Sequence, residues 1–138
     1  DSLDTERRRV RPIFKPDWSP DLLTSCMYMG HLLTIRRERF LQSGGLSSDY
    51  GDAHLFDLLL RLADEPLRVR HIPRVLYHGL SPLPAPSPTD PAARVITDAV
   101  TRREHTASTC VPGPSAGTFV VRRKRSTGEM TAIIVSLL

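Results

Sequence analysis

The chain has 138 residues, of which 40% are hydrophobic and 25% charged, and its formal net charge is +4. That length suits one domain with a modest core, and the composition is ordinary for a globular chain. No apolar run is long enough to span a bilayer, so we exclude a membrane span; Cys26 and Cys110 lie far apart without metal-ligand spacing, which favours a reduced, cytoplasmic protein.

The positive charge lies mainly in two arginine-rich runs, "ERRRVR" at 6–11 and "RRKR" at 122–125. Basic surface attracts phosphate-bearing partners such as nucleic acids, nucleotides or anionic lipids, but solvated arginines explain the same runs without a partner. No aromatic residues interleave with the runs, which argues against binding of single-stranded nucleic acid. We therefore expect no nucleic-acid partner.

The polar, charged residues 1–12 predict a loop. Ser19 directly before Pro20 predicts the start of a short helix over 20–26, with the serine as N-cap and the proline in the first helical position. Residues 30–35, "GHLLTI", have strand character.

The stretch "RRERFLQSGG" at 36–45 predicts a second short helix that ends at Gly44. Phe40 and Leu41 are expected to point inward. A loop follows before the next periodic segment.

The pattern over 53–64 predicts an amphipathic helix with Asp52 as its cap. Asp57 and Arg61 lie four positions apart, so their side chains can pair. One helical face carries the leucines Leu55, Leu58, Leu59 and Leu62.

Residues 68–79 predict an extended segment, in which Pro73 argues for a sheet edge or a break. The proline-rich stretch at 80–91 predicts a stiff linker, and Thr89 or Asp90 caps the helix that follows, with Pro91 first inside.

That fourth helix is expected to run to about residue 106 with a narrow apolar face, which is formed by Ala92, Ile96, Ala99, Val100 and Arg103. The Pro/Gly-centred stretch at 110–125 predicts a β-hairpin. The run "TAIIVSLL" at 131–138 predicts a buried strand.

Four stretches, in order, resemble bacterial family 2 glycosyltransferases, the inverting sugar transferases of surface-polysaccharide assembly. The stretches are "PIFKPDWSPDLLTSCMYMGHLLTIRRE" (12–38), "SGGLSSDYGDAHLFDLLLRL" (43–62), "VRHIPRVLYHG" (69–79) and the tail from "CVPGPSAGTFVVRRKR" to "TAIIVSLL" (110–138). The first and third are long matches to the family's Pro-Asp-Trp and His-Ile-Pro-Arg-Val-Leu-Tyr-His patterns. The fourth is similar to the segment that joins two tandem transferase domains.

The resemblance implies an α/β fold: a partial GT-A (Rossmann-like) sandwich followed by a linker helix and a small β-hairpin. It implies the acceptor-side half of a transferase domain at 1–80, a Pro-rich linker at 81–91, the helix and hairpin at 92–130, and a truncated first strand of a following domain at 131–138. Half of a sandwich leaves a sheet edge and an apolar helix face uncovered. We therefore expect this piece to be loose, or to associate with copies of itself.

Sugar transfer of this kind uses a divalent cation, Mg²⁺ or Mn²⁺, to neutralise the leaving diphosphate. By the resemblance, Asp1 is the last Asp of the family's Asp-x-Asp motif, and His78 could reach the metal or the diphosphate. The alternatives are a frayed chain end for Asp1 and a structural hydrogen bond for His78. We expect the metal in the parent enzyme and none on this fragment.

A general base must also take a proton from the acceptor hydroxyl. The family places it as the first Asp of a (Glu/Gln)-Asp-Tyr-Asp-Leu motif, and that position is Leu55 here, which cannot accept a proton. The second Asp is present as Asp57, and Asp52 and His54 are near enough in sequence to substitute. The structural alternative for Asp57 is a pair with Arg61. For Asp52 it is a helix cap, and for His54 it is a partly exposed position on the helix.

The resemblance places Asp17 and Trp18 in a loop that forms a substrate-side wall, where an indole face suits a sugar ring or a base. The structural alternative is an indole packed in the core. Gly44 and Gly45 permit close backbone approach to a ligand, or simply form a helix stop and a tight turn. Arg61 completes the substrate-binding candidates.

The parent protein would transfer a sugar from a nucleotide sugar to a bacterial surface glycan, in the cytoplasm or at the inner face of the membrane. The chain opens on "DSLD" without Met and closes on an apolar run, so we expect a fragment. By the resemblance it lacks the nucleotide-binding half and the usual base, so we expect the fragment itself to be inactive. A degenerate, non-catalytic binding or scaffold domain is the first alternative. A basic module that binds nucleic acid is the second.

Overall fold

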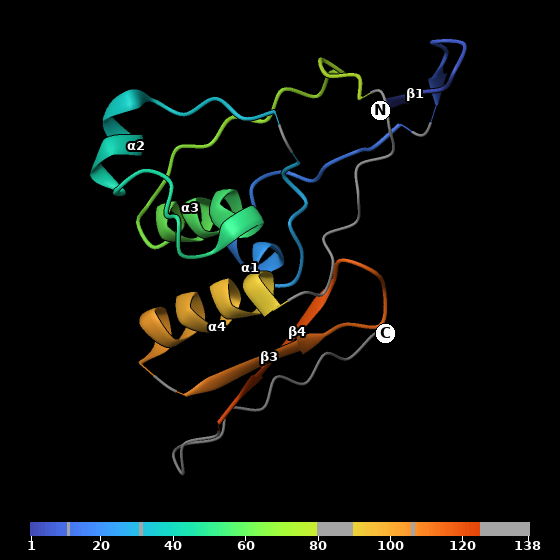
Figure 1. Ribbon diagram of the computed structural model, residues 1–138. Coiled ribbons are helices and arrows are strands. Elements are labelled where there is room, and N and C mark those ends of the chain that lie inside the picture. Colours follow the sequence, from blue (N-terminus) through green and yellow to red (C-terminus); the bar gives the residue numbers. More distant parts are fainter. Residues whose placement is uncertain (11, 31, 80–89, 106, 125–138) are drawn as a thin grey trace, which may run out of the picture.

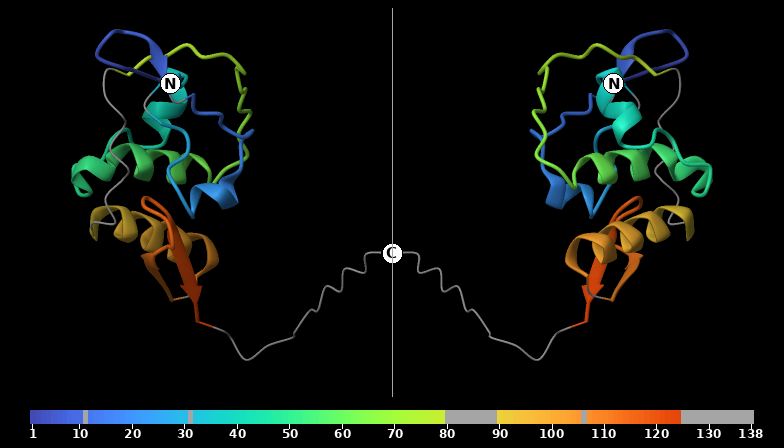
Figure 2. Two further views of the ribbon diagram at one scale, coloured as in Figure 1. Left: turned by 90° about the vertical axis from the view of Figure 1, so that its right-hand side faces the viewer. Right: turned by 90° about the vertical axis from the view of Figure 1, so that its left-hand side faces the viewer.

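The computed structural model describes residues 1–10, 12–30, 32–79, 90–105 and 107–124. Their elements, in chain order, are β1 (Ser2–Leu3), β2 (Arg9–Val10), α1 (Pro20–Leu23), α2 (Arg37–Gln42), the 3-10 turn η1 (Gly51–Ala53), α3 (His54–Leu62), α4 (Asp90–Glu104), β3 (Ser108–Pro112) and β4 (Phe119–Arg123). In Figure 1, α4 lies between the β3–β4 hairpin and α3, while α2 and the β1–β2 hairpin lie beyond α3. The two side views in Figure 2 show the same order.

Two regions follow from this arrangement. The packed region comprises α1, α3, α4, β3 and β4, which share one hydrophobic core. The open region comprises residues 12–18, 32–36 and 66–78, which are neither helix nor strand. Figure 1 shows the last of these running as an open arc from the end of α3 toward the N-terminal hairpin.

Helix α3 is buried on more than one face. Three leucines of the predicted face are buried, while Leu55, at the start of the helix, is half-buried. Phe56 and Leu60 are also buried, at 3% and 0% exposure, because α4 covers a second side of the helix. Ile96 of α4, with 0% exposure, lies in this contact. The apolar pattern thus predicted the helix, and packing against α4 extends its buried surface.

The predicted hairpin near the C-terminus is confirmed. Strands β3 and β4 pair antiparallel, with Cys110 opposite Val121 and Pro112 opposite Phe119. The ring of Phe119 enters the core, 6.4 Å between centroids from the ring of Phe56. Its backbone N–H also donates to the carbonyl of Ser25 at 2.8 Å, which fastens the hairpin to the segment after α1.

The start of α1 is as predicted. Ser19 is the N-cap, and its hydroxyl accepts a hydrogen bond from the backbone N–H of Leu22 at 3.2 Å. Pro20 occupies the first helical position. The helix ends at Leu23, three residues earlier than the predicted 20–26, since Thr24 is already its C-cap.

Helix α2 ends in a Schellman motif. The N–H of Gly44 bonds to the carbonyl of Leu41 at 3.0 Å, and that of Gly45 to the carbonyl of Phe40 at 2.9 Å. Gly44 has φ +83°, so the predicted glycine stop is confirmed. The predicted inward position of Leu41 is wrong, because its exposure is 60%, whereas Phe40 is half-buried.

Three local predictions are wrong. Residues 1–12 are not simply a loop, since β1 and β2 pair antiparallel, with Ser2 opposite Val10. The predicted strand at 30–35 is absent from its described residues. Asp52 does not cap α3: the N-cap is Ala53 and makes no side-chain bond. The linker at 80–89, the Thr89 cap and the strand at 131–138 lie outside the described residues.

The described chain is therefore a mixture of helices with small antiparallel sheets, which is consistent with an α/β class. The GT-A sandwich stays a prediction. The predicted helix after the linker is observed as α4, with Ala92, Ile96, Ala99 and Val100 buried. No helix in the described part of the chain combines the length and apolar character that a bilayer span requires.

Candidate functional site

The first residue is tied to residues 77–79. Asp1 Oδ1 lies 2.5 Å from His78 Nδ1, and the carboxylate side chain is only 5% exposed. The N-terminal ammonium donates to the carbonyl of Tyr77 at 3.4 Å, and the N–H of Gly79 donates to the carbonyl of Asp1 at 3.1 Å. Asp1 is therefore held in place rather than frayed. The two candidate metal ligands, 77 positions apart, meet each other.

This pair alone does not form a divalent-cation site. Asp1 and His78 supply one carboxylate and one imidazole side chain, whereas Mg²⁺ prefers six oxygen ligands. Among the described residues, no group of three or more His, Cys, Asp or Glu could hold a metal. The acid–imidazole contact thus offers at most two protein donors.

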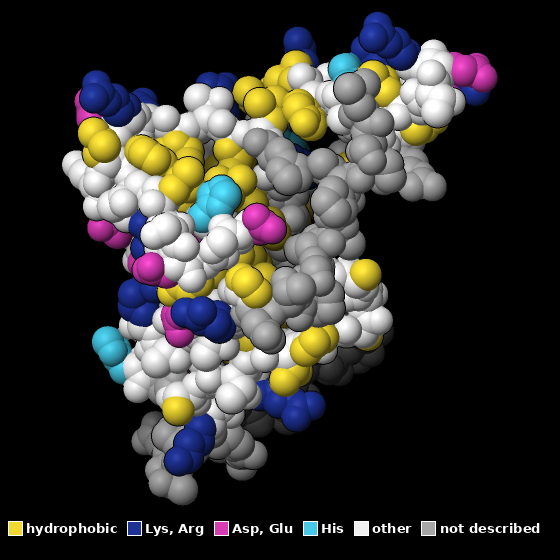
Figure 3. Space-filling model, in the orientation of Figure 1, with side chains coloured by type: hydrophobic (Ala, Val, Ile, Leu, Met, Phe, Trp, Pro, Cys, Tyr) yellow, Lys and Arg dark blue, Asp and Glu magenta, His cyan; other side chains and the backbone are white. Residues whose placement is uncertain are grey.

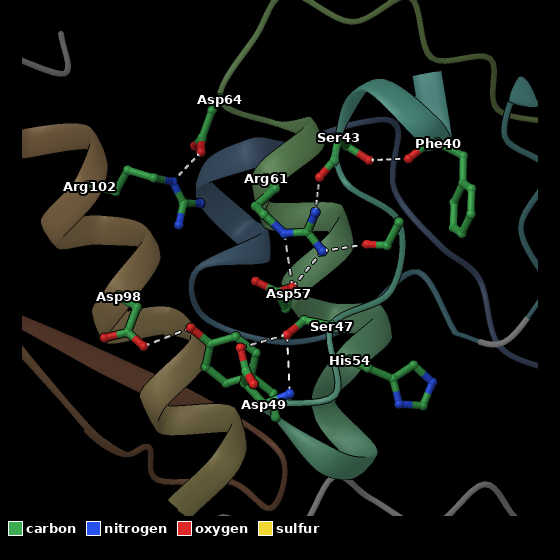
Figure 4. A network of polar contacts seen from close by, with 12 residues as sticks. Phe40, Ser43, Ser47, Asp49, His54, Asp57, Arg61, Asp64, Asp98 and Arg102 are labelled. Atoms are coloured by element: carbon green, nitrogen blue, oxygen red, sulfur yellow. Dashed lines mark hydrogen bonds and ion pairs between the residues drawn. The ribbon is translucent and has the colours of Figure 1, made fainter. Parts of the chain in front are cut away.

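Arg61 of α3 forms hydrogen bonds with the loop that follows α2 (Figure 4). Its guanidinium donates to Asp57 Oδ2 at 2.9 and 2.6 Å, to the carbonyl of Gly45 at 2.7 Å, and to the carbonyl of Ser43. Asp57 is 5% exposed. The predicted pair is thus confirmed, and both charges are used inside the protein.

The start of α3 carries the other candidate acid–base groups. Asp52 is exposed in the 3-10 turn. His54 Nδ1 lies 2.6 Å from the carbonyl of Gly51, and its ring points away from the Asp57–Arg61 pair (Figure 4). The position that the family pattern reserves for the base holds the half-buried side chain of Leu55. Asp57, two positions further along the helix, is paired with Arg61.

The sequence analysis missed a polar contact that fixes this loop. Tyr50 Oη donates to Asp98 Oδ2 of α4 at 2.9 Å, and Arg94 lies over the Tyr50 ring, 5.5 Å from its centroid. Burial and the hydrogen bond from the phenol to Asp98 raise the pKa of Tyr50. The i, i+4 spacing of Arg94 and Asp98 on a predicted helix was the available signal, but it did not identify Tyr50 as the partner.

Asp17 and Trp18 lie in the first segment of the open region and make different contacts. Asp17 Oδ1 lies 2.9 Å from His71 Nδ1, so it connects residues 12–18 to residues 66–78. Trp18 is half-buried and packs against the core. It also lines a hollow of about 1430 Å³ between the open segments. The indole is therefore both a packing group and a wall of the hollow.

The candidates do not all converge on this hollow. Asp1 lies on its lining, and Leu59 and Leu62 of α3 form part of its floor. Gly44 and Gly45, with Asp52 and His54, are not among its lining residues. In Figure 3, hydrophobic side chains gather over the upper part of the molecule, with Lys and Arg along its edge.

Comparisons with known proteins add a partial similarity. The chain is 47% identical over 79 residues to the O-antigen biosynthesis protein RfbC of Myxococcus xanthus, which covers 57% of this chain and 6% of that protein. It is 33% identical over 66 residues to the uncharacterized protein y4gI of Sinorhizobium fredii, which covers 46% of this chain and 7% of that protein. The chain therefore spans less than a tenth of either relative. No family model and no solved structure matches it.

Proposed function

We propose that this chain serves the biosynthesis of a bacterial surface glycan, as the acceptor-side part of a sugar-transferring protein. The observation that carries the proposal is the 47% identity over 79 residues to a protein named for O-antigen biosynthesis. The resemblance to family 2 glycosyltransferase motifs supports the transfer of a sugar as the reaction of the parent protein. The partners would be a nucleotide sugar and a growing glycan.

The acceptor would lie against the wall of the hollow that carries Trp18. A half-buried indole offers a rigid apolar face to the C–H side of a sugar ring. Asp17 beside it is exposed, and its second carboxylate oxygen can accept hydrogen bonds from sugar hydroxyls while the first contacts His71. This wall thus supports binding of a glycan without requiring chemistry.

Transfer itself needs a base, and the family's position for that base is occupied by Leu55 in the described start of α3. Leu55 cannot accept a proton, and Asp57 is neutralised by Arg61 in a contact of 2.6 Å. His54 is engaged with the Gly51 carbonyl, and Asp52 is an exposed turn residue. We therefore infer that the chain binds the acceptor and does not catalyse transfer, which is the binding-domain reading of the sequence.

A divalent cation, where the parent protein binds one, would neutralise the leaving diphosphate. The described residues include no cluster of three or more ligands that could hold it. We expect the isolated chain to retain no Mn²⁺ after gel filtration. We place the chain in the cytoplasm, which suits its two free cysteines.

The experiment uses Trp18, the only tryptophan, as its reporter. O-antigen oligosaccharides released by mild acid should change its fluorescence, whereas nucleotide sugars alone should not. Calorimetry should show the binding lost in Trp18→Leu and retained in Phe40→Leu, a matched control at a half-buried ring that does not line the hollow. Absence of any glycan binding overturns the proposal. Radiolabelled sugar transfer by the purified chain overturns the inactivity.

A further inference from the structure

The open region exposes large apolar side chains that the packed region would bury. Phe14 is 85% exposed, and the segment at 66–78 adds Val69, Ile72, Val75, Leu76 and Tyr77 at 40–60%. These side chains line the hollow of about 1430 Å³. Contiguous apolar surface of this kind marks an interaction site or an aggregation hazard.

The backbone of residues 67–72 makes few hydrogen bonds within the described chain. None of the amides from Leu67 to Ile72 donates a hydrogen bond to any part of the chain that the structure describes. Among the described residues, the only backbone bond accepted by residues 67–72 is 2.7 Å long, from the N–H of Arg74 to the carbonyl of Ile72. A row of unpaired N–H and C=O groups is a template for a further strand. Pro73 would end such a ladder, because it has no N–H.

The rim of the hollow is cationic. It is lined by one acid, Asp1, which is already engaged by His78, and by six basic residues, Lys15, Arg36, Arg39, Arg68, Arg70 and Arg74. Arg39 pairs with Glu65 at 3.1 Å. The other four arginines contact no described carboxylate in an ion pair. An occupant of the hollow is therefore required to be apolar in its centre and acidic at its edges.

We propose that the open region binds an extended, acidic segment of a partner protein, which adds as a strand along residues 67–72. Alternate apolar side chains of the partner would enter the hollow, and its carboxylates would pair with Arg68 and Arg70. The unpaired amides favour a polypeptide over a lipid, since a lipid tail offers no hydrogen-bonding groups in register. The cationic rim disfavours a second copy on this face, because two such rims would repel. The strand would lie along residues 67–72, whereas the glycan contact proposed for the Trp18 ring uses another part of the lining of the same hollow.

The probe is an acetylated and amidated nonapeptide of alternating valine and glutamate, labelled for fluorescence anisotropy. We expect saturable binding that weakens with salt. Alternate N-methylation of the peptide backbone should weaken binding by about tenfold or more, because each methyl removes a ladder donor. This comparison uses the wild-type chain and so does not depend on the folding of a variant.

Charge reversal tests the rim. The double variant Arg68→Glu with Arg70→Glu should weaken peptide binding by about tenfold or more. Arg122→Glu, at an exposed position on β4, is the matched control and should change affinity by less than about twofold. Circular dichroism checks that each variant folds.

Four outcomes would overturn the proposal. They are no binding of the nonapeptide, equal binding of its N-methylated form, equal binding of a valine–lysine peptide, and concentration-dependent dimers that exclude the peptide. Binding to phosphatidylglycerol vesicles that competes fully with the peptide and ignores N-methylation would assign the surface to a membrane instead.

Discussion

The packed and open regions use apolar residues in opposite ways. Ile96 of α4 is 0% exposed, whereas Phe14 of the open region is 85% exposed. Both regions are rich in hydrophobic residues, so their difference in burial does not come from composition. The difference is that the packed region has helices and a hairpin whose apolar faces can cover one another.

Backbone pairing explains why the open region fails to do the same. Its segments have β-prone residues but also Pro12, Pro16, Pro66 and Pro73, and none of them forms a ladder in the described chain. An extended segment without a ladder partner leaves its amides to water and cannot bury both faces. A chain therefore needs pairing partners as well as apolar residues to close a core.

The largest expected effect comes from the centre of the packed region. Ile96→Ala should lower the free energy of unfolding by about 3–4 kcal/mol, because it leaves a cavity between α3 and α4. Leu76→Ala, at a position 60% exposed in the open region, should change it by less than about 0.5 kcal/mol. Urea titrations of both variants provide the measurement. Similar losses would erase the distinction between the regions; if Ile96→Ala does not fold, Ile96→Val should still cost about 1 kcal/mol.

The second effect concerns the ion pair that holds the loop at residues 43–45. Arg61→Met should cost about 2–3 kcal/mol, since it leaves the buried Asp57 carboxylate and two carbonyls without their donor. Arg39→Met removes an exposed pair with Glu65 and should cost less than about 1 kcal/mol. Thermal unfolding measures both. Equal losses in the two variants would mean that the interactions of Arg61 with the loop stabilise the fold no more than a surface ion pair does.

The third effect concerns the tie between the loop and α4. Tyr50→Phe removes the hydrogen bond to Asp98 and should cost about 1 kcal/mol. Because the folded-state pKa of Tyr50 is raised above 10.0, the tie stabilises the fold at lower pH and is lost as pH rises through that raised pKa. Absorbance titration should show one tyrosine ionising at lower pH in Asp98→Asn than in wild type. If the tyrosine titration of Asp98→Asn equals that of the wild type, the hydrogen bond between Tyr50 and α4 is contradicted.

The smallest effect lies inside the hollow. Burial lowers the pKa of Lys15, whose ammonium also donates to the carbonyl of Met29. Lys15→Met should therefore raise stability by less than about 0.5 kcal/mol at pH 7. The gain should fall as pH rises through the lowered folded-state pKa of Lys15 and vanish only above 10.5, the ordinary lysine pKa, where wild-type Lys15 is uncharged in both states. Lys124→Met, at an exposed position after β4, should show no such pH dependence.

Local sequence signals predicted the elements that local chemistry determines. The Ser19 cap, the glycine stop at Gly44, the Asp57–Arg61 pair and the β3–β4 hairpin each depend on residues close in sequence, and all are confirmed. The β1–β2 turn was missed although Asp4 gave a signal. Its carboxylate accepts from the N–H groups of Glu6 and Arg8 at 2.9 and 2.8 Å, as turn-forming Asp residues do.

Long-range features could not be read in the same way. Burial of Phe56 and Leu60 depends on α4, which begins about thirty residues later in the chain. The contact between Asp1 and His78 was not predicted, because the family resemblance named each of them only as a candidate metal ligand, and that role stays a prediction. The strand expected at 30–35 shows the reverse error, because β-propensity without a neighbouring strand does not form a sheet.

The contact between Asp1 and His78 has an entropic consequence. It closes a ring of nearly eighty residues, and ring closure at that length costs about 4 kcal/mol in lost chain freedom. One short polar contact and a few backbone bonds near Gly79 offset little more than this. The two ends of this segment should therefore separate while α3 and α4 remain folded. In a hydrogen-exchange experiment, the amides of Leu3 and Gly79 should exchange well before those of the helices.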